Sequence, residues 1–206
     1  MAKVKPLKND ISTEEKIKQA ARSIFIQKGY AATRTRDIAA ASGINLALLN
    51  YYFRSKEKLF RLVMMETVQQ FVEKMKITVN EKSSTLEQKL ENIVSNYIDL
   101  LIAEPNFPIF ILNEVQSNPD MLMKETGIKD YIVNSVFTKQ LDAHFKKKKT
   151  VVNPVHFLMN FAGLTVFPFV AKPMIKAIAT INDSSFNALM LERKKLIPLW
   201  VNTMLN

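Results

Sequence analysis

The chain of 206 residues contains no cysteine and only four glycines. The absence of cysteine excludes disulfides, thiol catalysis and cysteine-ligated metal sites, and it suits a reducing cytoplasm. Because the turns of all-β and dinucleotide-binding α/β folds depend on glycine, so few glycines argue against both classes. Hydrophobic residues make up 48% of the chain, which is enough for a sizeable core. We therefore expect an all-α protein of the cytoplasm.

Long apolar runs and catalytic motifs are missing as well. No stretch of about 18 apolar residues occurs, and the segment MAKVKPLKND lacks the apolar region of a signal peptide. The two histidines, His144 and His156, do not have the spacing of metal ligands. Neither a glycine-rich phosphate loop nor a nucleophile elbow is present. The sequence thus predicts no membrane partner, no metal, no cofactor and no enzymatic activity.

Positive charge is present in excess, and it is unevenly distributed. The formal net charge is +10, and residues 1–61 contain 13 Lys and Arg against 5 Asp and Glu. The remainder contains 16 against 14. This asymmetry favours a polyanionic partner for the first third alone, although a simple gain in solubility is the alternative.

Helical periodicity, interrupted by capping residues, glycines and prolines, runs through the chain after residue 11. Ser12 and Glu15 have the spacing of a capping box at the start of a first helix, and Gly29 is expected to end it. Thr33 or Thr35 is expected to cap the second helix. The helices expected after the first, about nine in all, cover 35–41, 45–51, 55–80, 85–103, 107–117, 119–149 with a break at Gly127, 153–171 and 184–205.

The segment over 35–53 has the spacing of a helix-turn-helix. Ala39 is small where two helices must approach closely, and Gly43 supplies the backbone freedom that the turn requires. Asn45 is expected to cap the second helix of the motif. Ile38, Ile44, Leu49 and Phe53 would pack inward, which leaves Leu46, Ala47, Leu48, Asn50 and Tyr51 to face outward. Small and amide side chains on such a face, flanked by basic residues, suit the major groove of DNA.

The residues from Ile17 to Phe60 resemble the TetR (TetR/AcrR) family of transcriptional regulators. The matching positions are Ile17, Ala20, Ala21, Phe25, Gly29, Tyr30, Thr33, Thr35, Ile38, Ala39, Gly43, Ile44, Leu49, Tyr52, Phe53 and Ser55 through Phe60. Lys3, Lys5 and Lys8 indicate a flexible basic arm over 1–11. The resemblance implies a DNA-binding domain over 12–72 and a helical ligand-binding and dimerisation domain over 73–206. It also implies a repressor that a small hydrophobic ligand releases from its operator.

The resemblance further assigns roles to individual residues of the first domain. Thr35 and Arg36 are expected to contact a phosphate or a nearby base edge of DNA, and Tyr52 and Lys56 its sugar–phosphate backbone. The other expected DNA contacts are Asn45, Leu46, Ala47, Asn50 and Tyr51. Three residues depart from the family pattern: Asn45, Ala47 and Asn50. At these positions the family often has Ser or Thr, Gly, and Tyr, respectively. The departures leave the operator sequence open. The alternative for Tyr51 and Tyr52 is a place in the domain core.

Beyond residue 80 the resemblance extends only to the plan of the fold. It implies a homodimer formed by the last two helices, for which we expect Leu164, Phe186, Met190, Ile197 and Trp200. It also implies a ligand cavity, for which we expect Tyr97, Phe107, Phe110, Asn113, Phe157, Asn160 and Phe161. An ordinary intramolecular core is the alternative for each of these residues. The rival function is a helical carrier of hydrophobic ligands whose DNA binding is secondary.

Overall fold

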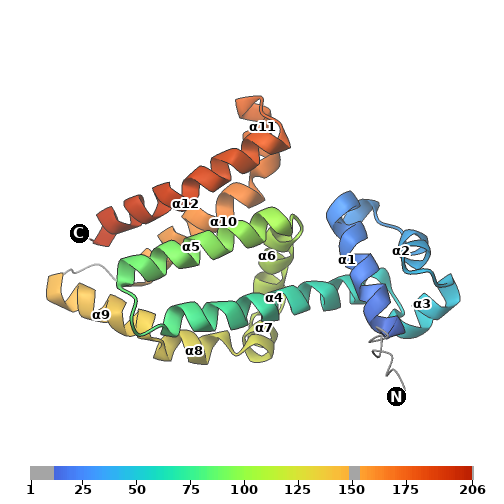
Figure 1. Cartoon of the computed structure of the whole chain (residues 1–206), viewed down its shortest axis with the longest axis horizontal. Helices are drawn as coiled ribbons and strands as arrows, with labels where there is room; N and C mark the ends of the chain where they lie inside the picture. The colour runs from blue at the N-terminus through green and yellow to red at the C-terminus, as the bar shows by residue number, and fades with distance from the viewer. Residues whose placement is uncertain (1–11, 149–153, 206) are drawn as a thin grey trace, which may run out of the picture. The chain divides into compact units, whose positions relative to one another are not determined.

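The computed structural model describes residues 12–148 and 154–205, all of whose regular elements are helices (Figure 1). The basic arm expected over 1–11 lies outside the described residues. The expected all-α class is confirmed. The chain divides into two compact units, the first ending at Glu66 and the second beginning at Thr67, with α4 (Lys56–Asn80) spanning the division.

Twelve helices are present in the described residues, where about nine were expected. The first unit contains α1 (Thr13–Ala32), α2 (Thr35–Ser42), α3 (Leu46–Phe53) and the start of α4. The second contains the rest of α4, α5 (Leu86–Ala103), α6 (Phe107–Ser117), α7 (Pro119–Thr126), α8 (Ile128–Asn134), α9 (Val136–Lys148), α10 (Pro154–Val170), α11 (Lys172–Ala179) and α12 (Asp183–Leu205).

Two of the additional helices come from the division of the segment over 119–149, in which only the break at Gly127 was expected, and the third, α11, lies where no helix was expected. Gly127 has a left-handed backbone, with φ of 62°, and Ser135 is extended. These two residues divide the expected helix over 119–149 into α7, α8 and α9. Ala171 separates α10 from α11. A glycine breaks a helix visibly in sequence, whereas a serine or an alanine does so only in its tertiary context.

The core of the first unit is built around the inner faces of α1, α2 and α3. Phe25 is fully buried and makes an edge-to-face contact with Phe60, with ring centroids 4.9 Å apart. Ile38, Leu49 and Phe53 are buried as expected. Burial of such large apolar side chains stabilises the unit by about 2 kcal/mol each, which fixes α3 by its inner face.

The ends of the first two helices agree with the expectation only in part. Ser12 caps α1, with its hydroxyl accepting from Glu15 N at 3.2 Å, but the Glu15 carboxylate binds Lys18 and not the Ser12 backbone. Gly29 is non-helical, with φ of 75°, and interrupts the helix as expected, although a short helical segment follows it up to Ala32. Neither expected threonine caps α2. Arg34 holds the cap position, and its backbone N–H donates to Asp37 at 3.3 Å.

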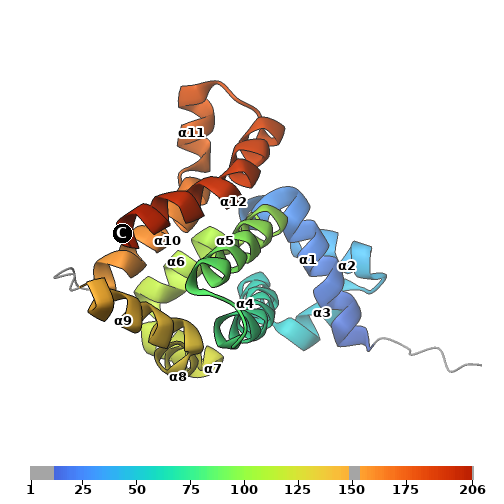
Figure 2. The same ribbon diagram turned by 60° about the vertical axis from the view of Figure 1, so that its left-hand side comes forward.

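In the second unit α12 lies along α5, as both views show (Figures 1 and 2). Thr85 and Gln88 form a capping box that begins α5. Phe186 at the start of α12 is fully buried and meets Phe169 of α10 edge to face, with ring centroids 5.8 Å apart. Lys172 and Lys176 of α11 both pair with Asp183, at 2.7 and 3.0 Å, which joins α11 to α12.

A proline inside α10 is compensated by an arginine of α12. Pro168 has no N–H, so it cannot donate to the carbonyl of Leu164 four residues earlier. Arg193 Nη2 donates to this carbonyl oxygen at 2.8 Å. Its guanidinium also lies 5.1 Å from the centre of the Trp200 ring, and burial lowers the pKa of Arg193. The arginine therefore satisfies a backbone acceptor that the proline leaves without its helical donor.

We expect Arg193→Met to lower the free energy of unfolding by about 2 kcal/mol, because one hydrogen bond and one cation–π contact are lost. In a Pro168→Ala background the new alanine N–H can bind the Leu164 carbonyl itself. The same arginine substitution should then cost about 1 kcal/mol less. Urea denaturation of the four chains in this double-mutant cycle measures the difference. Strictly additive losses would contradict this role of Arg193.

Two features are absent from the described residues. No single helix among them is long and apolar enough to cross a membrane, although α10 and α11 together, bent by 69°, meet the test of length and composition. Nor does the described part of the chain bring three or more His, Cys, Asp or Glu side chains into a group that could hold a metal ion.

Candidate functional site

The turn between α2 and α3 is closed by backbone hydrogen bonds around Gly43. Gly43 has φ of 70°, and its N–H donates to Ala40 O at 3.2 Å, while Ile44 N donates to Ala39 O at 3.1 Å. This bond pattern ends a helix sharply and requires a left-handed residue, which glycine adopts without strain. The expected role of Gly43 in the turn is confirmed.

Helix α3 presents one face to the core and the other to solvent. The Asn45 side chain accepts from Leu48 N at 2.8 Å, so the expected N-cap is confirmed. Leu49 and Phe53 are buried on the inner face. All the residues expected to face outward are exposed, namely Leu46, Ala47, Leu48, Asn50 and Tyr51, and Tyr51 is 80% exposed. Tyr52 is also exposed, so neither tyrosine belongs to the core.

The start of α2, shortly before α3 in the sequence, carries basic side chains. Arg36 is exposed and Thr35 is half-buried. Asp37 accepts from Lys28 Nζ at 3.0 Å and from the Arg34 backbone, and the hydrogen bond from Lys28 lowers the pKa of the Asp37 carboxyl. With Asp37 committed to these two donors, the arginines at this helix end remain the exposed charges that a phosphate would meet.

Lys56 has a structural role that the sequence did not reveal. Its ammonium donates to the carbonyl oxygens of Tyr30 at 2.8 Å and Thr33 at 2.9 Å, and it lies 4.3 Å from the centre of the Tyr30 ring. These contacts join the first turn of α4 to the segment that leads into α2. Lys56 therefore positions α2 as well as carrying a positive charge.

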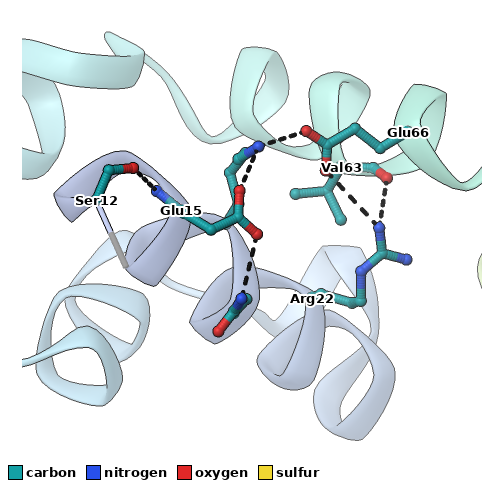
Figure 3. A network of polar contacts seen from close by, with 7 residues as sticks. Ser12, Glu15, Arg22, Val63 and Glu66 are labelled. Atoms are coloured by element: carbon teal, nitrogen blue, oxygen red, sulfur yellow. Dashed lines mark hydrogen bonds and ion pairs between the residues drawn. The ribbon is translucent and has the colours of Figure 1, made fainter. Parts of the chain in front are cut away.

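A second polar network joins α1 to α4 within the first unit (Figure 3). Lys18 Nζ lies 2.6 Å from Glu66 Oε1 and 2.7 Å from Glu15 Oε2. Arg22 Nη2 donates to Val63 O at 3.1 Å and lies 4.0 Å from the Glu66 carboxylate. The hydrogen bond to Glu15 raises the pKa of Lys18, with Glu66 contributing next. The network holds the early turns of α4 against α1.

Two substitutions separate positioning from sequence readout. We expect Lys56→Ala to weaken binding to specific and random DNA alike, because a charge and two structural hydrogen bonds are lost. Asn50→Ala should change the base preference instead, by about 1–3 kcal/mol at one position. Fluorescence anisotropy with a specific and a scrambled duplex distinguishes the two variants. Equal losses on both duplexes for both variants would contradict the assignment.

The second unit contains a cavity of about 630 Å³. Its lining comes from α4 through α10, is almost entirely apolar and includes no charged side chain among the described residues. A volume of this size is typical of a small-molecule site. The polar groups on its wall are the hydroxyls of Tyr97, Thr126, Tyr131 and Ser135. The cavity thus suits a ligand that is hydrophobic over most of its length.

The structure brings four of the seven expected ligand residues to this cavity. Tyr97, Phe107, Phe157 and Phe161 line it. Phe110 is buried away from its wall, and Asn113 and Asn160 are exposed outside it. Tyr131 of α8 was not expected. The sequence showed an aromatic residue four positions after Gly127, but the break after α7 left the orientation of α8 undetermined.

Of the residues expected at the dimer interface, some are buried in the chain and others are partly exposed. Phe186, Met190 and Ile197 are buried in the chain's own core, so they offer no surface to a second copy. Leu164 is half-buried, and Trp200 is 38% exposed. A separate set of apolar side chains on α12 is exposed instead: Leu189, Leu191, Leu196, Leu199 and Met204.

The fold and the outer face of α3 define a helix-turn-helix protein with a separate helical domain that contains a cavity. Residues 17–63 match the family model described as bacterial regulatory proteins, tetR family. The chain therefore contains a DNA-binding domain of the tetR family type and is a DNA-binding transcriptional regulator.

Three relatives illustrate the similarity. The chain is 26% identical over 176 residues to the "Probable HTH-type transcriptional regulator YttP" of Bacillus subtilis, with 82% of each chain covered. It is 28% identical over 128 residues to the fatty acid metabolism regulator protein of Bacillus subtilis, covering 60% of this chain and 66% of that one. The solved structure of FadR from Bacillus subtilis in complex with stearoyl-CoA has a similar fold, with a TM-score of 0.57, 19% identity, and coverage of 88% and 95%.

Proposed function

We propose that this regulator is a cytoplasmic repressor that leaves its operator when a long-chain acyl ligand occupies the cavity of the second unit. The observation that carries the proposal is the cavity of about 630 Å³ with no charged lining residue among those described. A second relative regulates fatty acid metabolism, and a protein of similar fold binds stearoyl-CoA. Ligand and operator would then favour different conformations, so that each weakens the binding of the other.

The DNA contacts are proposed from the outward face of α3 and the start of α2. Leu46, Ala47, Asn50 and Tyr51 would lie in the major groove, with Asn45 at the entry of the helix. Thr35, Arg36, Tyr52 and Lys56 would contact the sugar–phosphate backbone or a nearby base edge. Exposure of the α3 face above a buried inner face supports this orientation. The base-edge contacts would specify the sequence and the phosphate contacts the register.

A titration of DNA binding tests this function. The full chain is mixed with a labelled duplex from the region upstream of its own gene, and stearoyl-CoA is added at moderate salt. We expect a specific complex that dissociates as the ligand is added, while coenzyme A alone has no effect. A chain that binds this duplex no better than random DNA would refute the repressor, and one that ignores the ligand would refute the sensing.

We further propose that a homodimer forms through an exposed apolar stripe on α12. Leu189, Leu196 and Trp200 lie seven and four residues apart, so they share one face of the helix, and Leu199 and Met204 flank them. The neighbouring face of the helix, which contains Phe186, Met190 and Ile197, is buried against the chain's own core. An apolar surface that extends over two neighbouring faces is typical of a helix covered by more than one partner, and a dimer would place two copies of α3 for two half-sites.

Leu196→Asp is expected to convert the dimer to a monomer at micromolar concentration, because it places an unpaired charge in the interface. Lys195→Asp, on an exposed neighbouring position outside the stripe, is the matched control and should remain dimeric. Sedimentation velocity reports the mass of each variant. If Leu196→Asp sediments as the wild type does, the stripe is not the interface.

A further inference from the structure

The polar side chains on the cavity wall differ in how their hydroxyls are used. Thr126 Oγ1 donates at 2.7 Å to the carbonyl four residues earlier, and Ser135 Oγ donates at 2.9 Å to the carbonyl three residues earlier. Both hydroxyls are therefore committed to their own segments. The hydroxyls of Tyr97 and Tyr131 form no hydrogen bond with any other described residue. The hydroxyls of these two tyrosines are therefore available to donate a hydrogen bond to a ligand.

The two tyrosines approach the cavity from different helices but pack on one cluster. Tyr97 belongs to α5 and Tyr131 to α8, and both contact the buried cluster of Met75, Val79 and Ile93. The Tyr97 ring is held edge to face by a phenylalanine of α4, with ring centroids 4.5 Å apart. The shared cluster brings both phenols to one region of the wall, where they interrupt an apolar surface.

Both phenols remain protonated donors at neutral pH. Burial raises the pKa of Tyr97, and burial raises the pKa of Tyr131 to about 12, with the phenol of Tyr97 and the carboxylate of Glu73 adding to the shift. A phenol that keeps its proton can donate to an oxygen of a ligand. Binding that depends on these donors should therefore be constant between pH 6 and 9, well below the pKa of Tyr131.

The charges around the cavity determine whether a charged or an uncharged oxygen of a ligand is favoured. The cation near Tyr131 is Lys76, whose Nζ lies 5.6 Å from the centre of the tyrosine ring and 2.5 Å from Glu73 Oε1. This lysine is already paired with a carboxylate and does not line the cavity. A ligand carboxylate would therefore lose its hydration without gaining a cation, which costs several kcal/mol. An uncharged carbonyl oxygen needs only the two donors.

We propose that Tyr97 and Tyr131 form a polar anchor that binds the carbonyl oxygen of an aliphatic ligand and selects an ester, thioester or ketone over a free carboxylate. The proposal rests on the ligand-sensing function proposed above and specifies the chemistry that the same cavity recognises. The apolar wall accommodates the chain, and the anchor fixes where along the chain the carbonyl must lie.

Displacement of Nile red from the full chain tests the anchor with three probes of equal chain length: 2-decanone, decanoate and decane. The wild-type chain should bind 2-decanone at least about tenfold more tightly than decanoate at pH 8. Tyr97→Phe and Tyr131→Phe should each weaken 2-decanone binding about fivefold, the energy of one hydrogen bond. Decane binding should change by less than about twofold. Tyr30→Phe, in the other unit, is the matched control and should leave every affinity unchanged.

The possible results are distinct. If the double Tyr→Phe variant retains wild-type affinity for 2-decanone, or if decanoate binds as well as 2-decanone to the wild type, the anchor is overturned while the apolar cavity stands. If Nile red and all three probes fail to bind the wild type, the sensing function is overturned and the anchor with it. Loss of 2-decanone binding alone, with decane binding preserved, supports the anchor.

Discussion

Gly163→Phe is expected to abolish the response to ligand while leaving operator affinity within about twofold of the wild type. Gly163 lies in α10 and lines the cavity, and apart from its chain neighbours and the nearby backbone of α10 no atom lies within 4 Å of the position that a Cβ would take. A phenylalanine side chain can therefore enter the empty space and exclude an acyl chain. The ligand concentration for half-release from DNA should rise about a hundredfold or more, because the apolar contacts of the ligand are lost.

Gly163→Ala is the matched control for this variant. One methyl group leaves most of the cavity free, so release by stearoyl-CoA should persist, and the helix should gain about 1 kcal/mol from the removal of glycine. Anisotropy of a labelled operator, titrated with stearoyl-CoA, compares the two variants. A phenylalanine variant that still releases DNA at wild-type ligand concentrations would show that the ligand acts elsewhere.

Ala47→Glu is expected to reduce operator affinity about a hundredfold without changing the stability of the chain. Ala47 is exposed on the outward face of α3, so the substitution disturbs no core contact. If this face lies against a duplex, the carboxylate meets the phosphates and base edges of DNA, and like charges at an interface cost several kcal/mol. Ala177→Glu, exposed on α11, is the control and should bind DNA normally. If both variants bind the operator equally well, the outward face of α3 does not contact DNA.

Local chemistry made the DNA-binding surface predictable from sequence. Gly43 and Asn45 act through backbone conformation and a side-chain cap within a few residues, so their roles could be inferred without knowledge of the fold. The periodicity around Leu49 then indicated which face of α3 is buried. The cap of α2 was predicted wrongly because Asp37 binds the Arg34 backbone, a contact that competed with the two expected threonines.

The second unit was harder to predict because helical periodicity shows that a face is buried but not what buries it. Phe186, Met190 and Ile197 are apolar at helical spacing, which fits a dimer interface and an intramolecular core equally well. The structure places them in the core. Tyr131 was missed for a related reason: its orientation depends on the breaks at Gly127 and Ser135, and the second break is set by tertiary packing.

The most direct test uses the absence of cysteine, which makes any introduced thiol unique. Ala47→Cys and Ala177→Cys are each labelled with an iron–EDTA reagent that cleaves nearby DNA. From Ala47 we predict two centres of cleavage on the operator, separated by about one helical turn or a multiple of it, as a pair of recognition helices requires. From Ala177 we predict none. Cleavage from Ala177 with an uncut operator from Ala47 would contradict the assignment of α3 as the helix that reads DNA.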